Sequence, residues 1–157
     1  MPNDKMCVFG NEFMIQTEYD QNNPDTFMCS DELFSLPQKY NLAVMKNGKM
    51  SLCETYAGKD RLGDYANLRT YMGHYFFAQS SAGQYNTLQR YDLFFTPDKK
   101  ITLNDIFELY RFRYEGTPYS PDETDKENIR VIGSETQAST HVVQILADAP
   151  QEACEVS

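Results

Sequence analysis

The stretch LRTYMGHYF, residues 68–76, carries the clearest periodic pattern in the chain. Its apolar residues recur at i, i+3, i+4, i+7 and i+8, which is the spacing of an α-helix with one buried face. Arg69 lies at the edge of this apolar stripe, and His74 lies on the opposite face, where we expect solvent. The residues of the stripe are Leu68, Tyr71, Met72, Tyr75 and Phe76.

A second helix is predicted to begin at Thr102, whose hydroxyl can cap it with Asp105 at the third helical position. Gly116 is well placed as the first residue beyond this helix, and Pro118 cannot continue it. Its apolar stripe, which we expect to be buried, consists of Leu103, Ile106, Phe107, Tyr110 and Tyr114.

Strands are predicted near both ends. Residues 5–19, KMCVFGNEFMIQTEY, are typical of two short strands joined at Gly10–Asn11, a recognised hairpin signal. Residues 140–148, THVVQILAD, are apolar on both faces, which is typical of a buried strand. His141 within it is expected to be a hydrogen-bonded core histidine.

Two shorter predictions concern loops and a small helix. Ser30 can cap a short helix, and Pro37 is expected to break or restart it. The stretch PYSPDETDKEN, residues 118–128, is predicted to be an acidic surface loop. Its carboxylates lack the order of an EF-hand calcium loop, so a solvated face is the favoured interpretation.

Composition excludes several classes of function. The chain has 157 residues, enough for one domain, and a net charge of −9 without a cluster of Lys and Arg, so nucleic acid is disfavoured as a partner. No apolar run approaches the roughly 20 residues that span a bilayer, so no membrane partner is expected. The first residues show no signal-peptide pattern, and the location of the protein stays open.

The cysteines and histidines do not indicate a metal site. None of the four cysteines forms a C-x-x-C pair, and the two histidines lie far from them in sequence. No G-x-S-x-G motif is present, so a hydrolase with a nucleophile-elbow serine is not supported. No nucleotide-binding glycine motif is present either, and no cofactor is expected. Cys7 lies in an apolar stretch without a nearby cation, which predicts an inert thiol. The pairing state stays open for Cys7, Cys29, Cys53 and Cys154.

Five stretches, in this order, resemble the bacterial dipeptidases of the N-terminal-nucleophile (Ntn) cysteine hydrolase class, the relatives of dipeptidase A. Residues 2–15, PNDKMCVFGNEFMI, are similar to the family's Pro-Asp-Asp start and the strand that ends at an asparagine. Residues 22–34, NNPDTFMCSDELF, are similar to its Asp-Pro-x-x-Phe-Met-x-Ser-x-Asp segment. Residues 95–107 and 114–121 resemble the lead-in and exit of the helix before its Glu-Gly-Thr signature, and residues 139–145 resemble its Ser-His-Val-x-Gln strand.

The resemblance implies an α+β fold, part of a four-layer αββα Ntn-hydrolase sandwich. Residues 1–157 are expected to form a central segment of the catalytic domain, with the nucleophilic cysteine upstream. By the resemblance, Asn11 matches the asparagine whose amide stabilises the oxyanion, and Arg69 matches the helix arginine that supports the nucleophile. Taken alone, Asn11 is a turn residue and Arg69 is a cation at a helix edge.

The implied function is hydrolysis of dipeptides through an acyl-enzyme, with a dipeptide as the substrate of the complete enzyme. The 157-residue chain alone is expected to be inactive and, because of unpaired sheet edges and exposed apolar faces, either to self-associate, with a homo-oligomer as one outcome, or to be unstable. Two alternatives stay open. One is a non-catalytic relative or assembly subunit; the other is a tyrosine-rich extracellular module that binds sugars or peptides, because buried tyrosine hydroxyls favour a wet cleft.

Overall fold

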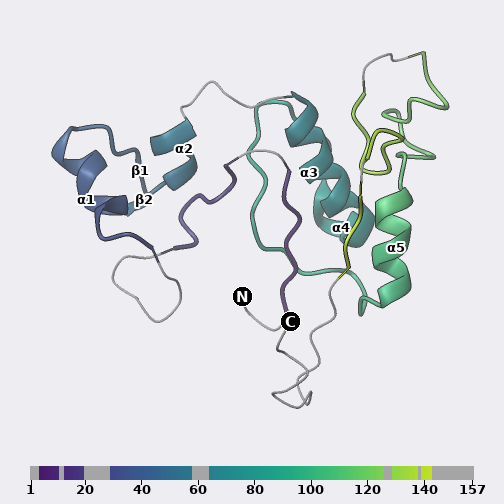
Figure 1. Cartoon of the computed structure of the whole chain (residues 1–157), viewed down its shortest axis with the longest axis horizontal. Coiled ribbons are helices and arrows are strands. Elements are labelled where there is room, and N and C mark those ends of the chain that lie inside the picture. The colour runs from purple at the N-terminus through teal and green to yellow at the C-terminus, as the bar shows by residue number, and fades with distance from the viewer. Residues whose placement is uncertain are drawn as a thin grey trace.

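The computed structural model describes residues 4–10, 13–19, 29–57, 64–125, 129–137 and 139–142 (Figure 1). Five helices and one two-stranded sheet are described, so these parts of the chain are α+β as expected. The elements are α1 (Glu32–Lys39), β1 (Met45–Lys46), β2 (Lys49–Met50), α2 (Leu52–Ala57), α3 (Asp64–Phe77), α4 (Gln79–Ala82) and α5 (Leu103–Arg111). None of the helices in these ranges is long and apolar enough to cross a membrane.

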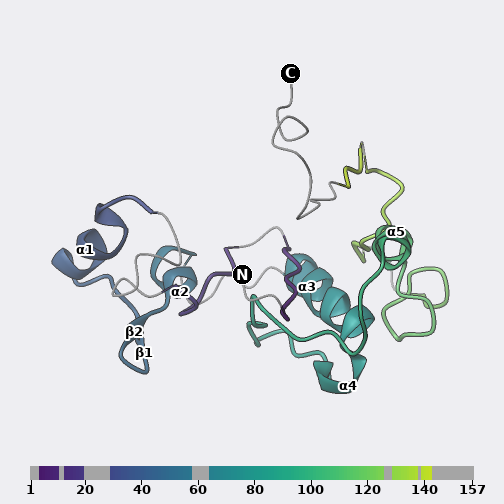
Figure 2. The ribbon, with the colours of Figure 1, turned by 90° about the horizontal axis from the view of Figure 1, so that it is seen from below.

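The elements gather in two groups, which Figures 1 and 2 show from perpendicular directions. One group holds α1, α2 and the β1–β2 hairpin, in which Met45 lies opposite Met50. The other group holds α3, α4 and α5. The N-terminal segment runs between the groups (Figure 1), and residues 15 and 16 accept backbone hydrogen bonds from Cys53 and Leu52 at the start of α2.

Helix α3 is the centre of the second group, and the helix predicted there is confirmed. Three residues of the predicted face lie in one core cluster, which consists of Leu68, Tyr71, Met72, Tyr91, Tyr114 and Val131, and Tyr75 packs against it. A second cluster joins the end of the helix to α5 and consists of Phe77, Ala78, Phe95 and Leu109. Phe76, the last residue of the predicted face, packs against this second cluster. Residues far apart in sequence therefore meet around this one helix.

The predicted solvation of His74 is wrong, because the face of α3 that carries it is also covered. His74 is only 8% exposed, and its ring centroid lies 4.1 Å from that of Phe95. The N-terminal segment covers the same side, where a Cβ at Gly73 would lie 2.5 Å from Cγ1 of Val8. A helix enclosed on several sides needs no solvated face.

The N-terminal segment does not pair locally within its described residues. Met6 forms an isolated antiparallel bridge with Phe95, with N···O distances of 2.8 and 2.9 Å. The predicted hairpin partner, residues 13–19, instead bonds to the start of α2 through residues 15 and 16. Tertiary partners thus replace the hairpin. Asn11, the second residue of the predicted turn, lies outside the described residues.

Helix α5 begins where predicted and ends earlier. The backbone N–H of Asp105 donates to the Thr102 hydroxyl at 3.3 Å, and the Asp105 carboxylate accepts from the Thr102 N–H at 2.8 Å, which is the expected capping box. The helix ends at Arg111, because Phe112 is extended and its carbonyl accepts from the Gly133 N–H at 2.9 Å. Gly116 has a positive φ of 71° but lies in a later turn.

The apolar stripe of α5 is buried only on the side that faces α3. Leu109 is 8% exposed and packs in the second cluster, with Ile106 against it. Leu103 and Phe107 are 45% and 41% exposed, so the prediction that the whole stripe is buried is wrong. The described part of the chain packs against one side of this helix and leaves the other open.

Two further predictions are corrected. Asp31, not Ser30, is the N-cap of α1, and its helical backbone angles give no side-chain cap. Pro37 lies inside α1, which continues to Lys39; in the last turn the missing N–H removes a single helical bond. His141 is exposed and outside any described strand, so it is not a core histidine; no described segment packs over it. Thr140 and Val142 are likewise exposed and outside any described strand, and residues 143–148 of the predicted strand lie outside the described residues.

Candidate functional site

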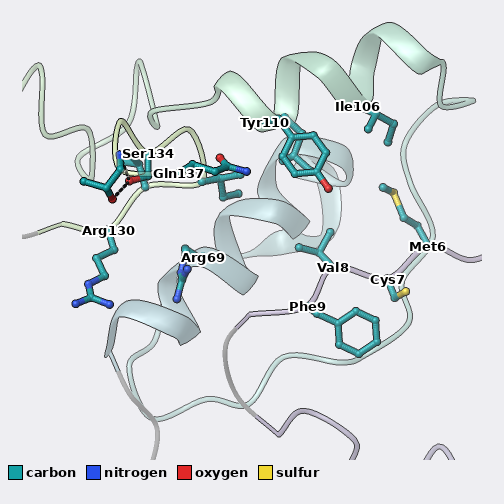
Figure 3. Close-up of a pocket in the computed structure, with 14 residues that line it drawn as sticks. Met6, Cys7, Val8, Phe9, Arg69, Ile106, Tyr110, Arg130, Ser134 and Gln137 are labelled. Carbon is teal, nitrogen blue, oxygen red and sulfur yellow. Dashed lines mark hydrogen bonds between the residues drawn. The ribbon is translucent and has the colours of Figure 1, made fainter. Parts of the chain in front are cut away.

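A cleft of about 820 Å³ lies between the N-terminal segment, α3, α5 and residues 130–137 (Figure 3). Arg69 of α3 lines it, as do residues 6–9 and three residues of α5. The far wall is formed by Arg130, Val131, Ile132, Ser134, Thr136 and Gln137. One of the two predicted site residues is therefore in a cleft. The other, Asn11, lies outside the described residues, one position beyond Gly10.

The far wall is held against α5 through the backbone. The Gly133 N–H donates to the Phe112 carbonyl, and a Cβ at Gly133 would lie 2.5 Å from the Arg111 carbonyl oxygen. Only glycine fits so close to a neighbouring backbone. The hydroxyl of Tyr114, a residue with no solvent exposure, donates to the Arg130 carbonyl at 3.2 Å. These contacts fix where the wall begins.

Arg113 fastens the same wall to the acidic loop. Its guanidinium donates to both carboxylate oxygens of Asp122, at 2.6 and 2.8 Å, and to the Gly133 carbonyl at 3.2 Å. The bond from Arg113 lowers the pKa of Asp122 below its ordinary value. Glu123 accepts from the Gly116 N–H at 2.7 Å. Two carboxylates of the predicted acidic surface loop, Asp122 and Glu123, therefore form hydrogen bonds within the protein. These bonds hold the turn that contains Glu115-Gly116-Thr117.

The charge of Arg69 acts on the buried Tyr114. Burial raises the pKa of the Tyr114 phenol well above its ordinary value, and the nearby positive charge of Arg69 opposes part of that rise. Arg69 is half-buried. Its guanidinium thus lies at the boundary between the core and the cleft, where water screens charge less than at an open surface. Such a position suits an electrostatic role toward a group bound in the cleft.

Cys7 lines the same cleft at some distance from Arg69. Figure 3 shows Cys7 and Met6 at one side of the cleft and both arginines at the other. Burial raises the pKa of the Cys7 thiol. A raised pKa leaves less thiolate at neutral pH, and the thiolate is the nucleophilic form. The expectation that Cys7 is an inert thiol agrees with this environment.

Sequence analysis missed the residues of the far wall. Arg130, Ser134 and Gln137 lie in a stretch without periodicity, which contacts with Phe112, Arg113 and Tyr114 bring to the cleft. The one local signal in this stretch is the glycine at position 133. A glycine can indicate that two backbone segments approach closely, but it does not indicate which segment is the partner.

Comparison with known proteins identifies the class of protein. The whole chain, residues 1–157, matches the family model of Peptidase family C69, and the chain belongs to that family. It is 27% identical over 120 residues to "Probable dipeptidase B" of Streptococcus pyogenes serotype M6 (strain ATCC BAA-946 / MGAS10394), a match that covers 76% of this chain and 23% of that protein. Relatives with the same printed name from serotypes M18 and M1 show the same identity and coverage. The expected resemblance to bacterial dipeptidases is confirmed, and the chain spans about a quarter of the length of these curated relatives.

Proposed function

We propose that the complete protein hydrolyses dipeptides and that residues 1–157 supply part of its active site. The observation that carries this proposal is the match to Peptidase family C69 along the whole chain. The printed name of the relatives, probable dipeptidase B, supports dipeptides as the substrate class. A cleft of about 820 Å³ is within the range of small-molecule sites and leaves room for a dipeptide.

We further propose that this segment is part of a four-layer αββα sandwich. The support is local. The extended N-terminal segment pairs with Phe95 through Met6, while α3 packs against the same segment at Gly73. A helix on one face of paired extended segments is the repeating element of such a sandwich. The remaining strands and the second helical layer belong, in this proposal, to the complete protein.

The proposed nucleophile is a cysteine made N-terminal by processing, in a segment outside residues 1–157. Its free α-amine, with an ordinary pKa of about 7.7–8.0, takes the thiol proton near neutral pH. The thiolate adds to the scissile carbonyl carbon, the amine returns the proton to the departing amino group, and the C–N bond breaks. Water then hydrolyses the thioester and regenerates the thiol.

Within this mechanism the chain contributes two groups. The side-chain amide of Asn11 donates to the oxygen that becomes negative when the thiolate adds. Arg69 stabilises the thiolate through its positive charge. Cys7 takes no part, because its own nitrogen is in a peptide bond and cannot act as the base, and because burial raises the pKa of its thiol.

The test is steady-state kinetics of the complete protein on dipeptides. Asn11→Ala is expected to lower kcat by roughly 10²–10³, the usual effect of removing one oxyanion donor. Cys7→Ser is the control and is expected to keep kcat of the same order as the parent. A loss below about tenfold in Asn11→Ala, with the thermal melt intact, would remove Asn11 from the mechanism. Abolished turnover in a folded Cys7→Ser protein would make Cys7 the nucleophile.

A further inference from the structure

Two arginines line the cleft of a chain that is acidic as a whole. The sequence has 23 Asp and Glu against 14 Lys and Arg. Among the described residues that line the cleft, two are arginines, Arg69 and Arg130, and none is an aspartate or glutamate. Guanidinium groups bind anions, so these two arginines favour an anionic group in the ligand.

The arginines and the apolar side chains occupy different parts of the cleft. Figure 3 shows Arg69 and Arg130 at one side, while Ile106 and Val8 lie toward the other. Leu109 of α5, which is 8% exposed, also belongs to the apolar lining. A ligand that fits this lining has an anionic group at one end and an apolar group at the other.

Arg130 extends from a fixed backbone. Its carbonyl accepts the hydroxyl hydrogen of the fully buried Tyr114, and the next residue, Val131, is 5% exposed in the first core cluster. The side chain of Arg130 itself is exposed. A planar guanidinium on an anchored backbone is suited to binding a carboxylate through two parallel hydrogen bonds.

We propose that Arg130 binds the free C-terminal carboxylate of the substrate, so that this cleft receives the leaving amino acid. This inference rests on the proposed function. A dipeptide carries an ammonium at one end and a carboxylate at the other, and a guanidinium binds the carboxylate end. The carboxylate belongs to the amino acid that departs when the peptide bond breaks. Val8, Ile106 and Leu109 then contact the side chain of that amino acid, which favours apolar residues at this position.

The experiment compares two substrates of the complete protein, an apolar dipeptide such as Ala-Leu and its C-terminal amide. Arg130→Gln is expected to raise KM for the free acid by about 10- to 100-fold, the usual effect of losing a charge-assisted hydrogen-bonded pair. For the amide, which has no carboxylate, KM is expected to change by less than about twofold, because that ion pair is absent. Arg130→Lys keeps the charge and is expected to recover part of the loss.

The matched control is Arg111→Gln, which removes an equal charge from the outer side of α5, where Arg111 pairs with Glu108 at 3.3 Å. It is expected to leave KM for both substrates unchanged. An equal rise of KM for acid and amide in Arg130→Gln, or no rise for either, would overturn the assignment.

A binding measurement separates this inference from the proposed function. The probes are N-acetyl-leucine and N-acetyl-leucinamide, titrated into the complete protein and followed by NMR. If no dipeptide is hydrolysed but the acid binds more tightly than the amide, and Arg130→Gln abolishes the difference, the carboxylate site stands and the dipeptidase proposal fails. Equal affinity of the two probes for the parent protein would overturn the carboxylate site.

Discussion

At the scale of single residues, His74 is the group whose observed environment differs most from its prediction. It lies on α3 between Phe95 and Tyr91, with ring centroids 4.1 and 6.0 Å away. Its Nε2 is buried, and no described residue forms a hydrogen bond with it. Burial lowers the pKa of His74, while the charge and a backbone hydrogen bond of Asp92 act in the opposite direction. The folded protein therefore favours the neutral imidazole of His74 over the protonated one.

Protonation of His74 is expected to cost stability in acid. Its ordinary pKa is about 6.5 in the unfolded chain and lower in the folded one. Near pH 7.5, about one unit above the pKa of the unfolded chain, both states are almost entirely neutral, and His74 has little effect on the pH dependence. As the pH falls below that value, the unfolded state takes up the proton first, so the free energy of unfolding decreases. Thermal melts between about pH 7.5 and 5 measure this slope.

Two variants isolate the effect. His74→Phe removes the titrating group and keeps an aromatic ring beside Phe95, so its melting temperature is expected to depend less on pH between about 6.5 and 5. His141→Gln removes the other histidine, which is exposed, and is expected to retain the slope of the parent. Identical slopes in the parent and in His74→Phe would contradict the assigned role of burial.

At the scale of elements, the contact between the end of α5 and the far wall of the cleft depends on Gly133. A Cβ there would lie 2.5 Å from the carbonyl oxygen of Arg111 and 2.6 Å from its carbonyl carbon. Both are backbone atoms, which cannot rotate away as the end of a long side chain can. The helix or the wall must therefore move if glycine is replaced.

Gly133→Ala is expected to destabilise the protein by about 1–3 kcal/mol, the usual range for forcing extra volume into a packed contact. Because the wall carries Arg130 and Gln137, the same change is expected to weaken ligand binding in the cleft. Gly48→Ala is the control: Gly48 has a φ of 78° but open space around its Cβ direction, so only local turn strain is added. Equal ligand affinity in Gly133→Ala and the parent would show that the wall does not depend on this contact.

Features that depend on contacts between nearby residues could be predicted from the sequence. Features that depend on contacts between distant residues could not. The start of α5 depends on Thr102 and Asp105, three residues apart, and it was predicted. Its end depends on Phe112 bonding to Gly133, and it was missed. Likewise, the Gly10–Asn11 signal predicted a local hairpin, but Met6 pairs with Phe95, eighty-nine positions away (95 − 6). Local patterns do not encode such partners.

At the scale of the whole molecule, sequence analysis predicted one arginine of the candidate site, Arg69, and missed the other, Arg130. Arg69 was placed at the edge of a helical stripe, and an edge position is what allows a side chain to reach both core and cleft. Arg130 could not be found, because it reaches the cleft only through the fold of residues 112–137. Asn11 stays a prediction, since it lies outside the described residues.

The surface of the 157-residue chain predicts self-association. Around α1 and β1 several large apolar side chains are exposed, among them Tyr40 at 59%, Leu42 at 65% and Met45 at 52%. Exposed apolar surface favours association, whereas the net charge of −9 opposes it by repulsion. The salt concentration determines which of these two effects dominates, because salt screens the charge repulsion. The Debye length falls from about 30 Å at 0.01 M to about 8 Å at 0.15 M. Apparent mass, measured by light scattering after gel filtration, is therefore expected to rise with salt.

The double variant Leu42→Glu, Met45→Glu is expected to stay monomeric. The control Gln38→Glu, which adds charge on α1 without removing apolar surface, is expected to associate nearly as the parent does. A mass that falls with salt, or that all three proteins share, would mean that this apolar surface does not drive association.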